Sequence, residues 1–163
     1  MLAKTHLLSA LVVASLPLVF GYETSYDTNA ILYFLAVSFG ALIPDIDEHK
    51  SYIGKRLLFI SFPIKTFFGH RTITHNLILP LFGVILSIVW VKSFLWFGFF
   101  LGVIVHILGD AMTGNVKGAL LPIRDKFYIL PKKMIFSVGG PIEYVMLYTL
   151  VLALIAEHSM GFI

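Results

Sequence analysis

Imidazole and carboxylate side chains recur at the ends of apolar segments of this sequence, where they could bind a divalent cation. His106 and Asp110 form the clearest pair, because residues four apart on a helix lie on one face, about one turn apart. They end the apolar run 98–110, where an ionisable side chain without a partner would be costly. The other candidate ligands are His6, Asp45, Asp47, His70, His75 and Glu143. Because the chain has no cysteine, a metal must take nitrogen and oxygen ligands, which suits Zn²⁺, Mn²⁺ or Mg²⁺.

Five apolar segments would carry these side chains. They are Leu7–Phe20, Ala30–Ile43, Leu77–Val91, Phe94–Leu108 and Ile142–Ala156. Hydrophobic residues make up 58% of the chain and charged residues 13%, whereas an ordinary soluble domain has about 45–50% and about 25%. We therefore predict an all-α membrane helix bundle of about five spans that forms one integral membrane domain over residues 1–163.

Each segment is shorter than the about 20 residues that cross a bilayer. The helices should therefore extend into their flanks, tilt, or be re-entrant where protein shields the backbone from lipid. The first segment resembles the apolar part of a signal peptide. We interpret it as a membrane helix, because four further apolar segments follow it.

The basic residues predict the orientation of the bundle. With five spans, the N-terminus and the connections 45–76 and 113–141 share one side, which carries eleven of the twelve Lys and Arg residues. Lys92 alone lies on the other side, so the first side should face the cytoplasm and the C-terminus should lie outside. Every span then brings at least one candidate ligand to the cytoplasmic face. The net charge of +3 is explained by this asymmetry, and no nucleic-acid partner is expected.

Such a group of ligands suggests hydrolysis. One or two divalent ions held by His and Asp side chains would lower the pKa of bound water toward neutrality. Asp47, two residues after Asp45, is the candidate general base or bridging ligand. Arg71 could make a bidentate contact with a phosphate or carboxylate, or could only balance the nearby carboxylates.

Five short motifs follow one another along nearly the whole chain. They are Thr5-His6, Pro44–Asp47 with Ser51 and Gly54, Phe68–His75, His106–Thr113, and Gly139–Glu143. In this order they resemble the LexA-regulated, inner-membrane metal-dependent hydrolase family. The resemblance implies a membrane-bound hydrolase of phosphate esters in the cell inner membrane, with a ligand layout similar to that of the all-helical zinc-dependent phospholipases C. Glu48 and Pro141 depart from the family pattern, which usually has His and Ser at these positions.

Three functions fit these observations. The first is the metal-dependent hydrolase, and a phospholipid is its favoured substrate because basic and aromatic residues surround the site and would attract anionic headgroups. The second is a metal or proton transporter, which the absence of charged residues within 7–20 and 94–105 weakens. The third is a structural or partner-binding membrane protein, in which the polar cluster only satisfies helix ends. The oligomeric state stays open.

Overall fold

The computed structural model describes residues 1–19, 28–123 and 127–159, and these residues form an all-α bundle. Its α-helices are α1 (Ala3–Val19), α2 (Thr28–Leu42), α3 (Leu58–Phe68), α4 (Ile78–Leu86), α5 (Phe94–Thr113) and α6 (Pro141–Ser159). Short 3-10 turns form η1 (Ile43–Asp47), η2 (Ile73–His75) and η4 (Lys132–Met134), and a π-helical turn, η3 (Ser87–Val91), extends α4. The described part of the chain contains no β-strand, so the predicted fold class is confirmed.

The described residues of all five predicted apolar segments form helices, which differ in length, and Phe20 at the end of the first segment lies outside the described residues. Three helical stretches are long and apolar enough to cross a membrane: Ala30–Asp47, Phe94–Thr113 and Pro141–Ser159. The apolar stretches of α1 and of α4 with η3 are shorter, at 10–17 residues. Extension into the flanks explains the added length of α5, which continues five residues beyond the predicted end at Leu108 to include Asp110.

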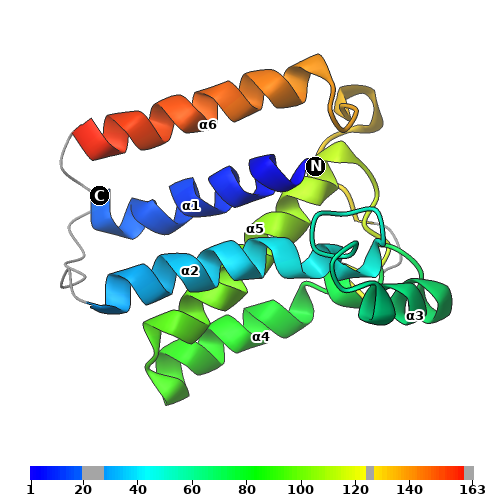
Figure 1. Ribbon diagram of the computed structural model, residues 1–163, viewed down its shortest axis with the longest axis horizontal. Helices are drawn as coiled ribbons and strands as arrows, with labels where there is room; N and C mark the ends of the chain where they lie inside the picture. The colour runs from blue at the N-terminus through cyan, green and yellow to red at the C-terminus, as the bar shows by residue number, and fades with distance from the viewer. Residues whose placement is uncertain (20–27, 124–126, 160–163) are drawn as a thin grey trace.

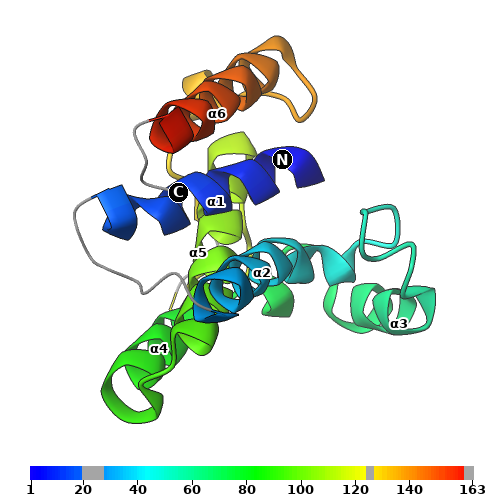
Figure 2. The same cartoon turned by 60° about the vertical axis from the view of Figure 1, so that its left-hand side comes forward.

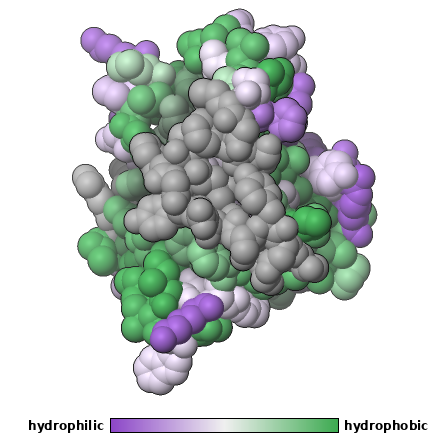
Figure 3. All heavy atoms as spheres, turned by 90° about the vertical axis from the view of Figure 1, so that its left-hand side faces the viewer, coloured by the Kyte–Doolittle hydropathy of each residue, from purple (hydrophilic) through white to green (hydrophobic). Residues whose placement is uncertain are grey.

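In Figures 1 and 2, α1 lies between α2 and α6, and α5 runs across α1 and α2 with α4 beside it. Helix α5 packs against α1, α2 and α4, whereas α6 packs mainly against α1. The outer surface of the bundle is apolar, with Ile31, Phe82 and Leu152 each at least 60% exposed. Seen from the end opposite α3, apolar surface is also prominent among the described residues (Figure 3). Such an exterior suits contact with lipid rather than water.

Glycines allow the backbones of α2 and α5 to approach closely. A Cβ atom on Gly40 would overlap the carbonyl oxygen of Phe99, and one on Gly102 would overlap that of Val37. Small residues at helix contacts are typical of membrane bundles, where packing rather than water exclusion drives association. We call the contact through Gly40 and Gly102 the glycine seam. Because α2 and α5 run side by side along it, their C-terminal ends lie together and η1 packs against α5.

The connection after α5 folds back onto the segment that precedes α4. The amide of Gly118 donates to the carbonyl of Arg71 at 2.8 Å, and the amide of Leu77 donates to that of Ala119 at 2.8 Å. The side-chain amide of Asn76 donates to the carbonyl of Gly118, while its oxygen accepts from the amides of the first turn of α4. These bonds fix η2 beside α5.

One helix was not predicted. The sequence analysis treated 45–76 as a connection, but α3 forms within it. Its eleven residues include Pro63, which lacks the amide hydrogen of a regular helical bond, and Lys65 interrupts the apolar pattern. A short, interrupted segment of this kind gives little helical signal in a sequence.

Candidate metal centre

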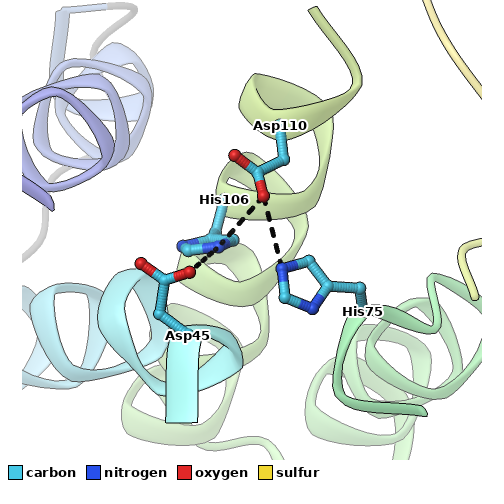
Figure 4. Close-up of side chains that lie close together, drawn as sticks. All are labelled: Asp45, His75, His106 and Asp110. Atoms are coloured by element: carbon cyan, nitrogen blue, oxygen red, sulfur yellow. Dashed lines mark ion pairs between the residues drawn. The ribbon is translucent and has the colours of Figure 1, made fainter. Parts of the chain in front are cut away.

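Four ionisable side chains converge where η1, η2 and α5 meet. They are Asp45, His75, His106 and Asp110, here called the His–Asp quartet, and their ligand atoms all lie within 4.8 Å of one another (Figure 4). His75 and His106 are fully buried, Asp110 is 1% exposed, and Asp45 is partly buried. Two imidazoles and two carboxylates in a buried cluster make a nitrogen–oxygen ligand set suited to a divalent cation.

The distances within the quartet leave room for an ion. Nε2 of His106 lies 3.7 Å from Oδ1 of Asp45 and 3.9 Å from Oδ2 of Asp110, and Nε2 of His75 lies 3.4 Å from the same Oδ2. Neither Nε2 atom has a hydrogen-bond partner among the described residues, although both are buried. Buried polar atoms normally have partners. Ligands about 2.0–2.1 Å from a tetrahedral Zn²⁺ would be about 3.3–3.4 Å apart. The distance between His75 and Asp110 matches this spacing and the two His106 distances are longer, so a small inward shift would place these side chains around a shared cation.

His106 is held in the form that binds metal. Its Nδ1 lies 2.6 Å from the carbonyl oxygen of Ala41, near the end of α2. A carbonyl can only accept, so Nδ1 must carry the hydrogen, and the lone pair of Nε2 faces the quartet. The sequence did not reveal Ala41 as a partner. Pro44 is the residue in the sequence that could have indicated this bond. Proline has no amide hydrogen, so a carbonyl near the end of α2 needs a donor from elsewhere.

His75 lies between two carboxylates. Its Nδ1 is 3.0 Å from Oγ1 of Thr74 and 3.2 Å from Oδ2 of Asp47, and its Nε2 faces Asp110. Burial favours the neutral ring, but the nearby carboxylates of Asp110 and Asp47 outweigh it and raise the pKa of His75 to about 8. The surroundings of His75 therefore stabilise positive charge, which a bound cation would supply in place of the proton.

Asp47 lies beside the quartet rather than within it. Its fully buried carboxylate accepts hydrogen bonds from the amide of Arg71 at 2.9 Å and from the hydroxyl of Thr74, and Nδ1 of His70 lies 2.7 Å from its Oδ1. Both oxygens are thus engaged by protein donors. His70 is 34% exposed at its side chain, and its ring centre lies 5.8 Å from that of His75.

Two further predicted residues contact the quartet through Asp110. Nε of Arg71 lies 2.8 Å from Oδ2 of Asp110, and Nε2 of His6 lies 3.2 Å from Oδ1. The ring of His6 also stacks on that of His106, with centroids 3.7 Å apart. Arg71 has a φ of 60°, a left-handed conformation that is uncommon outside glycine. The α-amine of Met1 lies 2.5 Å from the same Oδ1, a contact that the sequence analysis did not anticipate.

Glu143 lies apart from the quartet. Its carboxylate accepts hydrogen bonds from the amide of Leu2 at 2.6 Å and from the amide of Gly139 at 2.7 Å. It therefore connects the start of α1 to the start of α6. Of the eight predicted ligands, four form the quartet, His6, Asp47 and His70 surround it, and Glu143 bonds to backbone amides instead.

Comparison with known proteins adds a family to this geometry. The family model described as the YdjM inner membrane protein matches residues 1–161. The chain is 38% identical over 102 residues to "Inner membrane protein YdjM" of Escherichia coli (strain K12) and of Shigella flexneri, which is 56% of this chain and 52% of each relative. That match spans about half the length of these relatives. The chain is also 31% identical over 140 residues to "Uncharacterized protein YvsG" of Bacillus subtilis (strain 168), or 84% of both chains. No solved structure matches it.

Proposed function

The chain belongs to the YdjM family of inner membrane proteins, and from this premise we propose that it is a metal-dependent hydrolase of phosphate esters. Phospholipid is the proposed substrate. The observation that carries the proposal is the pair of buried imidazole Nε2 atoms, on His75 and His106, that lack hydrogen-bond partners among the described residues and face two carboxylates. The motif likeness to the LexA-regulated hydrolases and to zinc-dependent phospholipases C agrees with this proposal.

The His–Asp quartet is the proposed ligand set, with Zn²⁺ as the first candidate and Mn²⁺ or Mg²⁺ as alternatives. Such a cation supplies Lewis-acid activation of water and of a phosphoryl oxygen. Oriented imidazoles distinguish this cluster from an ordinary network of helix-end groups. Ala41 orients His106, and Asp47 with Thr74 orients His75, in the manner of the outer partners found around protein metal sites.

Proton transfer is proposed to involve Asp47 and His70. Asp47 was predicted as the general base, and its role stays a prediction. Because Oδ1 of Asp47 contacts Nδ1 of His70, the Nε2 atom of His70 is the one left to accept or donate a proton at the partly exposed edge of the centre. A carboxylate that orients a histidine in this way is a common arrangement for general acid–base catalysis.

Arg71 has two proposed roles that are compatible. Its Nε contact with Asp110 neutralises a buried carboxylate, as the charge-balancing interpretation expects. The guanidinium carries five N–H donors, and Nη2 donates to the hydroxyl of Thr113 at 3.4 Å. The remaining Nη donors are available for a phosphoryl oxygen on which negative charge develops. The side chain of Arg71 is 18% exposed, which keeps it at the rim of the centre.

The test is metal analysis followed by a lipid hydrolysis assay on the full chain in nanodiscs. We expect about one or two equivalents of metal and metal-dependent cleavage of a phospholipid phosphate ester, both lost in His106→Ala. His49→Ala is the matched control, because His49 is near the centre in sequence but its side chain is 38% exposed and faces Glu48. Protein with full metal content that cleaves no phosphate ester would contradict the substrate class. Metal flux across liposomes without any cleavage would favour a transporter.

A further inference from the structure

Helix α3 does not fit the rest of the bundle. With eleven residues it is about 16 Å long, which is too short to cross a bilayer. It lies at the end of the bundle that contains η1, and its main packing contact is with η1 (Figures 1 and 2). The function of such a short, peripheral helix must depend on what covers its outward face.

That outward face is aromatic. Phe59, Phe62 and Phe67 are 75%, 67% and 79% exposed, and their spacing places them on one side of the helix. Ser61, on the opposite side, is fully buried. The helix thus directs its small polar residue toward the protein and its largest apolar side chains away from it. In water this arrangement would be unfavourable, so the aromatic face requires an apolar environment.

Apart from Glu48, which pairs with Lys65, the charge next to α3 is positive. Residues 49–69 contain no Asp or Glu, and the basic side chains of Lys55 and Arg56 lie exposed in the turn before the helix. The guanidinium carbon of Arg56 lies 3.8 Å from the centre of the Tyr52 ring. Aromatic residues next to basic ones are typical of segments that lie at an anionic membrane surface.

The C-terminal end of α3 leads directly to the metal centre. Near its C-terminal end, Nζ of Lys65 contacts the two carboxylate oxygens of Glu48 at 2.8 and 2.7 Å, and Glu48 follows Asp47 in the chain. The helix ends at Gly69, which has a φ of 78°, and His70 follows at once. The position of α3 relative to the membrane therefore also sets the position of the centre.

We propose that α3 is an interfacial helix whose partner is an anionic phospholipid surface. The helix lies in the plane of the headgroups, with Phe59, Phe62 and Phe67 buried about 5–10 Å into the headgroup–acyl boundary. Lys55 and Arg56 face the lipid phosphates. This holds the rim of the metal centre at headgroup depth. The placement requires neither a bound metal nor catalysis, so it can succeed or fail independently of the hydrolase proposal.

Because the chain has no cysteine, single-cysteine spin labels can test this placement in the full-length protein. The labelled variants are Phe62→Cys and Phe67→Cys, with Lys132→Cys in η4 as the exposed control. In nanodiscs containing phosphatidylglycerol, labels at 62 and 67 should show a severalfold higher ratio of oxygen to nickel-complex collision rates than the label at 132. Equal ratios at the three positions would overturn the proposal. So would spin–spin broadening at 62 and 67, which would mean that a second copy covers the face.

A charge reversal tests the preference for anionic lipid. Lys55→Glu with Arg56→Glu should reduce the oxygen-to-nickel ratio at residue 62, and the reduction should be greater in phosphatidylglycerol than in phosphatidylcholine. Lys132→Glu with Lys133→Glu is the matched control and should leave the ratio unchanged. Ratios at residue 62 that do not respond to the reversal at 55 and 56 would overturn the anionic preference. A melting temperature measured for each variant distinguishes loss of docking from loss of the fold.

Discussion

Helices α5 and α6 are similar in length and apolar character, but they have different positions and different uses for their carboxylates. Half of the apolar window of α5 is buried inside the bundle, against 17% of the window of α6. Each helix carries one buried carboxylate at the end of the bundle near the centre, Asp110 on α5 and Glu143 on α6. Asp110 is surrounded by imidazoles and a guanidinium, whereas Glu143 accepts from backbone amides.

The difference shows that a carboxylate at a membrane boundary cannot be assigned from its own position. Asp110 lies beside the buried Nε2 atoms of His75 and His106, which lack hydrogen-bond partners among the described residues, so it fits a cation site. Glu143 is already satisfied by two amides, Leu2 and Gly139, so its oxygens have less need of a metal. Its contacts suit a clamp between α1 and α6.

The largest expected effect comes from removing one charge on each helix. Asp110→Asn should abolish metal binding, because it removes a ligand and the charge opposite Arg71 and His75. Glu143→Gln makes the same chemical change on α6 and should retain nearly full metal content, with only a lower melting temperature. Metal analysis of both purified variants by mass spectrometry checks this. If both variants lose their metal, the two carboxylates are equivalent and the contrast between the helices is wrong.

Next in size is the packing of the two helices. Gly102→Val should destabilise the bundle by about 1–3 kcal/mol, because the new side chain would meet the backbone of α2 at Val37 and Ala41. Ala156→Val, on the exposed side of α6, should change the stability by less than about 0.5 kcal/mol. Thermal unfolding in one detergent measures both. Equal destabilisation would mean that α6 is packed as tightly as α5.

A third carboxylate, Asp47, contacts His75 but is not itself in the quartet. Its substitution tests whether a carboxylate that only orients a ligand affects metal binding. Asp47→Asn should weaken metal binding about 10–100-fold, because Asp47 orients His75 and does not belong to the quartet. Glu48→Gln, one residue further, should leave the affinity unchanged. Zinc titration against a competing chelator measures both values. Unchanged affinity with complete loss of turnover would instead identify Asp47 as the general base that the sequence predicted.

The smallest effect belongs to Glu48, whose side chain is more exposed than those of Asp45, Asp47 and Asp110. Burial favours its neutral form, but the bonds from Lys65 and from the amide of Lys50 together outweigh it and lower the pKa of Glu48. The pair with Lys65 should stabilise the fold by about 0.2–1 kcal/mol above pH 4.5, the ordinary value for Glu. This contribution should disappear as the pH falls below that value. Melting curves of the wild type and Lys65→Met should therefore differ at pH 7 and converge in acid, and a constant difference would contradict it.

Local patterns predicted much of the fold and part of the centre. Apolar runs of 14 to 15 residues marked each long helix, and the four-residue spacing of His106 and Asp110 placed both on one face of α5. Contacts between segments were not predictable in the same way. The bond from His106 to Ala41 depends on the glycine seam, and the fold of 114–123 onto 71–77 depends on backbone amides that carry no sequence signature. The prediction of Glu143 as a ligand rested on its position and on the motif Gly139–Glu143, neither of which reveals its bonds to backbone amides.

The seam between α2 and α5 also has a consequence for biosynthesis. The quartet draws on η1, η2 and α5, which the ribosome completes in that order, and α5 comes last with both His106 and Asp110. Asp45 and His75 are synthesised earlier, when the two α5 ligands do not yet exist. A high-affinity centre can therefore form only after α5 has inserted and closed against α2. Loading of the metal should follow translocon release rather than accompany synthesis, and a nascent chain that ends before α5 should take up no metal.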